Sequence, residues 1–295
     1  MKLKPALIGL AVSASFGMAG TASAALELPV SGNGSLIFVA WDITSTRDSF
    51  RGYSRDLGFR LNDFLPSSIP ALPDDGSPAG TRTPSTGTTV AFAADPLFQQ
   101  TFAGATASNI RWNIFGGDSD DLFVSGSGTL RMVITGSTAP TGSNSALGTS
   151  LANGDTFITG LNNNGNGGAG CQPSCNDISP ALLGFGGNAD QWGSRLGQAL
   201  PVGNDTTATG FGSTNFYYLA ETGPNSGGTA AQAFSVTQFA NKADTAQWTL
   251  SSDGSLVYAL LAEPIEPAPI PLPAAAWLLL AGLGGLMGVG RKRNS

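Results

Sequence analysis

Apolar and polar residues alternate along several short stretches of this chain. Leu130, Met132 and Ile134 fall on one face of an extended segment, because side chains alternate between the two sides of a strand. The same alternation recurs at residues 110–114 and 246–250, and clusters of Gly, Asn, Ser and Pro separate such stretches. The pattern predicts an antiparallel sheet of many short strands.

A hairpin is predicted at Asp253 and Gly254, because this pair lies between two strand-like runs and Gly tolerates a positive φ. Residues 36–42 are apolar on both faces, which is typical of a strand inside a two-layer structure. Tyr217 and Tyr218 must point to opposite faces of a strand, which predicts that one of them lies outside the core. Further strands are expected at residues 88–93, 156–161, 215–220 and 233–239.

Short helices are expected at two places. Asp95 is a suitable N-cap ahead of Pro96, a residue that is favoured in the first helical turn. Asp190 precedes a second segment whose apolar residues share one side of a helix. The prediction is therefore an all-β domain, an antiparallel β-sandwich of jelly-roll-like form with one or two short helical insertions.

The composition favours turns and excludes several kinds of enzyme. With 41 Gly, 18 Pro and 12% charged residues, the chain is suited to turns more than to long helices, while 16 Phe and 5 Trp suffice for a core. The chain contains no His, which excludes Ser-His-Asp and Cys-His catalytic sites and His-based metal centres. We expect no cofactor.

The net charge of −6 understates the acidity of the middle of the chain. Five of the fourteen basic residues lie at the two ends, which leaves nine basic against twenty acidic residues and a net charge of −11; the five are Lys2, Lys4, Arg291, Lys292 and Arg293. Because phosphate contacts need clustered Lys and Arg, this balance argues against a nucleic-acid partner.

Residues 1–24 have the three-part layout of a secretory signal peptide, with a basic start, an apolar stretch and a small-x-small pattern. Ala22 and Ala24 form that pattern, so signal peptidase is expected to cut between Ala24 and Ala25 after export by the Sec machinery. An uncleaved N-terminal signal helix that anchors the chain is the alternative.

The other end of the chain combines a Pro-rich segment, an apolar stretch and a basic tail. Residues 274–290 carry no charge, and as a helix they would reach about 25 Å, barely across a bilayer. They predict a single transmembrane helix in the inner membrane. The tail at 291–295, with Arg291, Lys292 and Arg293, is expected to stay in the cytoplasm by the positive-inside rule.

This arrangement resembles the VPLPA variant of the PEP-CTERM sorting signal, with Ile270, Pro271, Leu272, Pro273 and Ala274 as its motif. The family has Val at the position of Ile270, and both residues are β-branched and apolar. The resemblance implies that an exosortase, a membrane protease-transpeptidase, recognises the motif, cuts the chain near it and releases or re-attaches the exported domain. A plain single-pass anchor without processing is the alternative.

The resemblance also implies a location. It places the chain first in the inner membrane and then at the cell surface or in the extracellular matrix of a Gram-negative, exopolysaccharide-producing bacterium. The segments GSLIFVAWD and WTLSSDGSLVY resemble parts of exported PEP-CTERM proteins that have no assigned activity. We expect a signal peptide at 1–24, an exported domain at 25–262, a linker at 263–269 and the sorting signal at 270–295.

Cys171 and Cys175 are the only cysteines, and in an oxidising envelope we expect them to form a disulfide that closes a small loop. A redox-active pair is the alternative, although thioredoxin-like motifs have two intervening residues and this pair has three.

Asp118, Asp120 and Asp121 form the densest acidic cluster and are a candidate Ca²⁺ site, because carboxylate oxygens are the ligands that Ca²⁺ prefers. An EF-hand would need a ligand and a Gly where Leu122 and Phe123 stand, so we expect no metal and a solvated turn.

Four tryptophans, Trp41, Trp112, Trp192 and Trp248, lie on apolar stripes and are expected to pack in the core, although exposed ones could stack on sugar rings. The leading hypothesis is a structural or adhesive, non-enzymatic protein of the cell surface or biofilm matrix. The alternative is a carbohydrate-binding module for the exopolysaccharide. A third hypothesis, an exported hydrolase, requires a pair of catalytic carboxylates.

Overall fold

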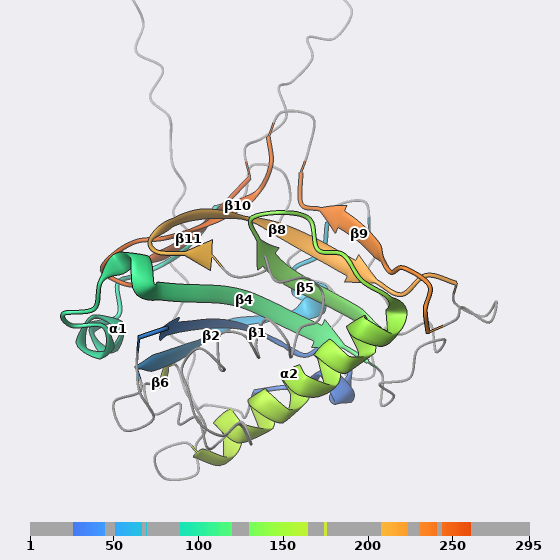
Figure 1. The fold of residues 1–295 in the computed structure, drawn as a ribbon, viewed down its shortest axis with the longest axis horizontal. Coiled ribbons are helices and arrows are strands. Elements are labelled where there is room, and N and C mark those ends of the chain that lie inside the picture. Colours follow the sequence, from blue (N-terminus) through green and yellow to red (C-terminus); the bar gives the residue numbers. More distant parts are fainter. Residues whose placement is uncertain are drawn as a thin grey trace, which may run out of the picture. The chain divides into compact units, whose positions relative to one another are not determined.

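An antiparallel sheet dominates the part of the chain that the computed structural model describes (Figure 1). That part comprises residues 26–44, 51–66, 69, 89–119, 130–164, 174–175, 208–223, 230–240 and 244–260. All of these residues belong to one unit, Met1–Glu263, and the second unit, Pro264–Ser295, lies outside them. The prediction of a mostly antiparallel β domain is confirmed.

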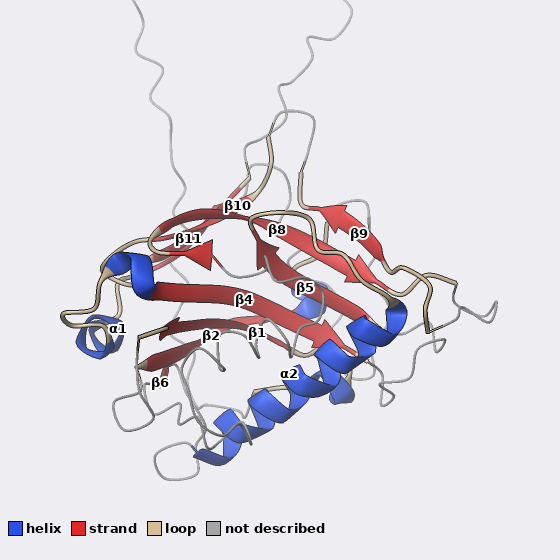
Figure 2. Cartoon of the chain, viewed as in Figure 1, coloured by secondary structure: helices blue, strands red, loops and turns tan. Residues whose placement is uncertain are grey.

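Eleven strands of the described part form this sheet, and all their pairings are antiparallel. Their order is β3-β11-β10-β8-β5-β4-β1-β2-β6, with β7 beside β4 and β9 beside β8. The strands are β1 Ser35–Asp42, β2 Gly52–Arg60, β3 Thr89–Phe92, β4 Ile110–Asp118, β5 Arg131–Gly136, β6 Ser174–Cys175, β7 Ala208–Thr209, β8 Gly212–Ala220, β9 Ser235–Gln238, β10 Gln247–Leu250 and β11 Leu256–Ala259. The α-helices, blue in Figure 2, are α1 Pro96–Thr101 and α2 Asn144–Asn164, and the 3₁₀ turns are η1 Pro29–Ser31, η3 Leu61–Asp63 and η4 Ala107–Asn109.

The sheet curls until strands near its two ends meet through their side chains. Phe59 on β2 and Phe92 on β3 have ring centroids 6.4 Å apart, although these strands lie far apart in the strand order. The Arg55 guanidinium lies over the Phe92 ring, 5.2 Å from its centroid, and donates a hydrogen bond to the carbonyl of Ala93 at 3.0 Å. The result is one continuous sheet curled into a half-barrel, and the predicted division into the two stacked sheets of a sandwich is not confirmed.

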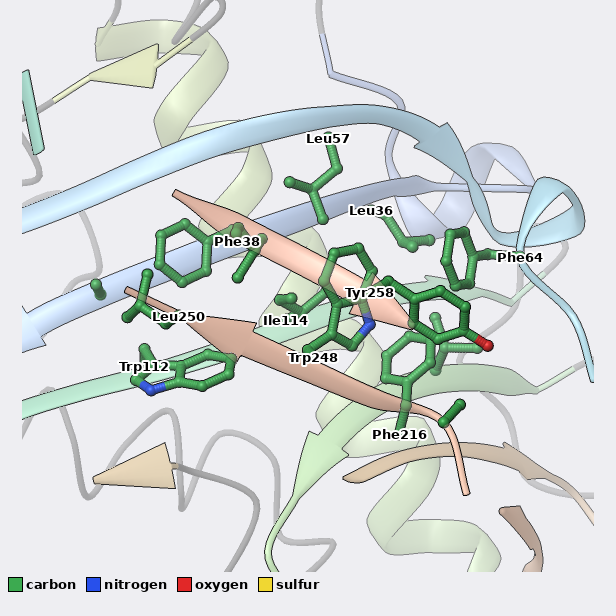
Figure 3. Packing of buried hydrophobic residues seen from close by; sticks show 14 of the residues in the cluster. Leu36, Phe38, Leu57, Phe64, Trp112, Ile114, Phe216, Trp248, Leu250 and Tyr258 are labelled. Carbon is green, nitrogen blue, oxygen red and sulfur yellow. The ribbon is translucent and has the colours of Figure 1, made fainter. Parts of the chain in front are cut away.

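Aromatic side chains fill the concave side of the curled sheet (Figure 3). Phe64 contacts Trp248 and Tyr258, with centroid distances of 5.6 Å and 4.9 Å. Phe38 on β1 meets Trp112 on β4 edge to face at 6.0 Å. An aromatic side chain buries about 150–250 Å² on folding, so this cluster supplies a large part of the hydrophobic stabilisation.

Helix α2 covers part of the opposite, convex face (Figure 1). Leu147, Leu151 and Ile158 pack there against side chains from β1, β4, β5 and the C-terminal half of β8. Among the described residues, this second cluster includes none from β3, β10 or β11. On the convex face, α2 therefore covers strands from the middle of the sheet, namely β1, β4, β5 and part of β8.

The length of α2, 21 residues, contradicts the prediction that helices would be short, and residues 156–161, expected to form a strand, lie within it. The segment is rich in Gly, Asn and Thr, which have poor helix propensity and hide the helical spacing of its few apolar residues. Packing of those residues on the sheet outweighs the propensity.

Other local predictions are confirmed. β1 is buried along its whole length, and the β10–β11 hairpin turns at Gly254, whose φ is 82°. Asp95 caps α1, with its Oδ1 accepting a hydrogen bond from the backbone N–H of Leu97 at 2.8 Å. The strands expected at residues 88–93, 215–220 and 233–239 correspond to β3, β8 and β9.

The expectation that one residue of the Tyr217–Tyr218 pair lies outside the core is wrong. Both are buried, at 4% and 5% exposure. They do point to opposite faces, but Tyr217 joins the cluster beneath α2 while Tyr218 joins the aromatic cluster. The sheet is covered on both sides at this point, so no outward position remains.

The segments predicted to form a signal peptide at 1–24, a helix after Asp190 and a sorting signal at 270–295 all lie outside the described residues. Within the described ranges, we find no helix with the length and apolar character needed to cross a membrane.

Candidate functional site

Arg131 and Asp118 form a buried ion pair where β5 begins and β4 ends. The two residues are cross-strand partners, and their side chains are 5% and 4% exposed. Arg131 donates from Nη2 to Asp118 Oδ2 and from Nη1 to Asn62 Oδ1, the latter at 3.0 Å. Since little water reaches the pair, each charge depends on its protein partner for stabilisation.

Tyr218 on β8 adds a phenol to this cluster. Burial raises the pKa of Tyr218 above its ordinary value, and the nearby Arg131 guanidinium, which is also its hydrogen-bond partner, only partly offsets that increase. The phenol therefore stays neutral at physiological pH and cannot serve as a base there.

Hydrogen bonds tie the N-terminal segment to the same cluster. The backbone N–H of Asn62 donates to Asn33 Oδ1 at 2.7 Å. The backbone N–H and the hydroxyl of Ser119 both donate to the carbonyl of Pro29, at 2.9 Å and 3.2 Å. These bonds fix Ser119 at the point where the chain leaves β4.

This cluster stabilises charge but presents no reactive group. Its guanidinium cannot act as a base at neutral pH, its carboxylate is ion-paired and its phenol is neutral. Within the described ranges, no three Cys, Asp or Glu side chains lie close enough together to hold a metal ion. The ion pair and its hydrogen bonds are suited to holding β4 and β5 together.

The candidate calcium residues are only partly covered by the structure. Asp118 is paired with the Arg131 guanidinium, and a carboxylate held in that way is a poor cation ligand. Asp120 and Asp121 lie outside the described residues, so their role stays a prediction.

Three of the four candidate sugar-stacking tryptophans are core residues. Trp41, Trp112 and Trp248 are all 0% exposed, which confirms the packing prediction for them. Trp192 lies outside the described residues.

Cys175 lies in β6 beside Ser54 of β2, while Cys171 is outside the described residues, so the disulfide stays a prediction. The residues of the predicted signal-peptide cleavage site and of the predicted sorting signal lie outside the described residues; these are Ala22, Ala24, Ala25, Ile270, Pro271, Leu272, Pro273, Ala274, Arg291, Lys292 and Arg293.

The sequence alone does not predict that Arg131, Asn62 and Tyr218 take part in this cluster. One signal was present, because Arg131 is the single charged residue in the apolar run 130–134 and Asp118 ends another strand. Opposite charges at the ends of neighbouring strands commonly pair. The contributions of Asn62 and Tyr218 depend on the tertiary fold.

No protein-family model, curated protein or solved structure matches this chain.

Asp155 on α2 gives the fold a pH-dependent contact. Its Oδ1 accepts a hydrogen bond from the backbone N–H of Val30 at 3.2 Å. Partial burial raises the pKa of Asp155 above its ordinary value of 3.8, and the Val30 bond offsets part of that increase. The folded chain thus holds this proton more tightly than the unfolded chain, so the stability associated with it is lost as the pH rises through the folded-state pKa.

We expect Asp155→Asn to abolish this loss of stability with rising pH. The asparagine side chain still has an oxygen that can accept the hydrogen bond from the backbone N–H of Val30, but it cannot ionise. The measurement is the melting temperature from about pH 3 to pH 7. Asp253→Asn is the matched control, and its effect on the pH dependence of stability should have the opposite sign. A hydrogen bond from the backbone N–H of Ser255 lowers the pKa of exposed Asp253, whereas the pKa of Asp155 is raised. Identical pH profiles for the two variants would contradict the prediction.

Proposed function

We propose that this chain is an exported, exosortase-sorted protein of the cell surface or extracellular matrix with a structural or adhesive role. The observation that carries the proposal is the order of three segments near the C-terminus. The Pro-rich motif at residues 270–274 is followed by an apolar stretch and then by the basic tail at 291–295. With the secretory pattern of residues 1–24, this order is that of a protein exported first and sorted afterwards.

The finer structural elements of the proposal follow from the same segments. Residues 1–24 form a signal helix that signal peptidase removes, and residues 274–290 form one transmembrane helix that holds the intermediate in the inner membrane. The exosortase then cuts near Pro271 to Ala274, and the domain reaches the surface of a Gram-negative cell.

The described domain supports a structural role more than an enzymatic one. Its concave interior is filled with aromatic side chains, and its buried ion pair holds two strands together. The alternative, a carbohydrate-binding module, would have to recognise the exopolysaccharide without Trp41, Trp112 or Trp248, because these are buried.

Processing of a doubly tagged chain tests the proposal. One tag follows Ala25 and the other follows Ser295, in a host that carries an exosortase. We expect the C-terminal tag to be lost, and we expect Pro271→Ala with Pro273→Ala to keep both tags in the membrane fraction.

The matched control is Pro267→Ala with Pro269→Ala, which removes two prolines just outside the motif and should be processed normally. If the unmodified chain keeps both tags when the exosortase is present, the chain is a plain single-pass anchor. If the control is blocked as well, the motif is not what the protease recognises.

A further inference from the structure

Side chains of α2 hold the backbone of the first described residues. The N–H of Leu26 donates to Asn162 Oδ1, and Asn162 Nδ2 donates to the carbonyl of Leu26, both at 2.9 Å. Four residues later, the N–H of Val30 donates to Asp155 Oδ1 at 3.2 Å. Asp155 and Asn162 are seven residues apart, about two helical turns, so one face of α2 binds this stretch at both points. We call residues 26–31 the docked segment.

The docked segment is also packed into the fold. Leu26 is 2% exposed and belongs to the cluster beneath α2, and Leu28 packs against the same cluster. The carbonyl of Pro29 accepts two hydrogen bonds from Ser119, at the end of β4. The backbone of the segment is therefore bonded to residues that lie about 90 or more positions later in the chain.

The predicted signal-peptidase cut comes directly before the docked segment. Only Ala25 separates Ala24 from Leu26, so the length of the chain keeps the bond after Ala24 within about 8 Å of the Leu26 Cα. An enzyme that binds an extended peptide does so through the peptide's main-chain hydrogen-bonding groups. Both such groups of Leu26 are bonded to Asn162. Docking of this segment and cleavage beside it therefore exclude each other.

The composition of α2 delays this docking. The helix is rich in Gly, Asn and Thr, and a helix of such residues is marginal without tertiary packing. The strands on which it packs include β8, through Tyr217 and Leu219. The surface beneath α2 is therefore incomplete until the chain has left the membrane at least as far as residue 219.

We propose that docking of residues 26–31 on α2 ends the period in which the signal peptide can be removed, so signal peptidase must act before α2 packs. The low helix propensity of α2 keeps this period open during export, and the Asn162 amide closes it. A chain that folded first would keep both of its apolar ends in the membrane. This inference rests on the proposed secretory cleavage and adds the order in which cleavage and folding occur.

Cleavage of the uncut, full-length chain by purified signal peptidase in mild detergent tests this order. One sample meets the peptidase as it is diluted from urea, and the other meets it after refolding. We expect the cut after Ala24, identified by N-terminal sequencing, to be at least about tenfold slower in the refolded sample. Asn162→Ala removes both bonds to Leu26 and should speed cleavage of the refolded chain roughly tenfold.

Two further variants separate local release of the segment from a general loss of stability. Thr156→Ala, on the exposed side of α2, should be cut as slowly as the unmodified chain. Leu250→Ala opens a cavity in the aromatic cluster, which lies on the other face of the sheet, and should leave the cleavage rate nearly unchanged because local release needs less free energy than global unfolding.

Three results would overturn the proposed order: equal rates in the two samples, no faster cleavage of Asn162→Ala, or cleavage of Leu250→Ala as fast as that of Asn162→Ala. Each of them leaves the secretory cleavage itself intact. If the sample diluted from urea is not cut after Ala24 at all, the secretory cleavage is wrong and the order fails with it.

Discussion

Replacing Asp118 with Asn is expected to destabilise the fold by about 3–5 kcal/mol, because it leaves the Arg131 guanidinium buried without its negative partner. Asn62 and Tyr218 still accept hydrogen bonds from Arg131, but neither carries a negative charge. Urea unfolding followed by tryptophan fluorescence measures the loss, since Trp112 and Trp248 report on the packed interior.

Glu27→Gln is the matched control for this substitution. Glu27 pairs with Arg60 at 3.0 Å, but both side chains are 38% exposed, so removing that charge is expected to cost at most about 1 kcal/mol. A similar loss of stability in Asp118→Asn and Glu27→Gln would show that burial does not govern the Arg131–Asp118 pair.

Gly34→Ala is expected to destabilise the fold by about 2–3 kcal/mol through a clash with rigid backbone. A Cβ at Gly34 would lie 2.6 Å from the carbonyl oxygen of Gly117, which accepts a hydrogen bond from Gly34 N–H at 2.9 Å. It would also lie 3.0 Å from the nitrogen of Pro29. Because these are backbone atoms, no side-chain rotation relieves the overlap.

The contrasting substitution is Gly154→Ala on α2. A Cβ at Gly154 would meet only Phe115, at an ordinary contact distance of 3.5 Å. The same chemical change should therefore raise stability, by about 0.5–1 kcal/mol, because Ala favours the helix over the unfolded chain. Chemical denaturation of both variants tests the pair, and a loss of stability in Gly154→Ala would contradict the packing described for α2.

The strands could be predicted where alternation and turn residues agree. Trp248 and Leu250 alternate with polar residues, and Asp253-Gly254 marks the following turn, so the β10–β11 hairpin was evident from local sequence. Helix α2 could not be predicted in this way. Its Gly, Asn and Thr residues have low helix propensity, and the helix is stabilised by its contact with the sheet.

The candidate site could likewise be predicted only in part from local sequence. The burial of Trp41, Trp112 and Trp248 follows from their apolar neighbours in sequence. The Arg131–Asp118 pair depends on the register between β4 and β5, and its contact with Asn62 depends on a residue far earlier in the chain. The alternation of apolar and polar residues restricts the register to pairings that keep the apolar residues on their faces, but it does not select one of these pairings, which depends on how the two strands pack in the fold.

The position of β11 between β10 and β3 has a consequence for the order of folding. Within the described part of the chain, Thr89 to Phe92 pair only with residues 256–259, so the edge of the sheet at β3 cannot form until the chain up to residue 259 is available. Pairing across so long a separation is slow, because loop closure must precede it. A chain that crosses a membrane starting from its N-terminus would thus remain incompletely folded until β11 emerges, a state that is compatible with passage through a narrow channel.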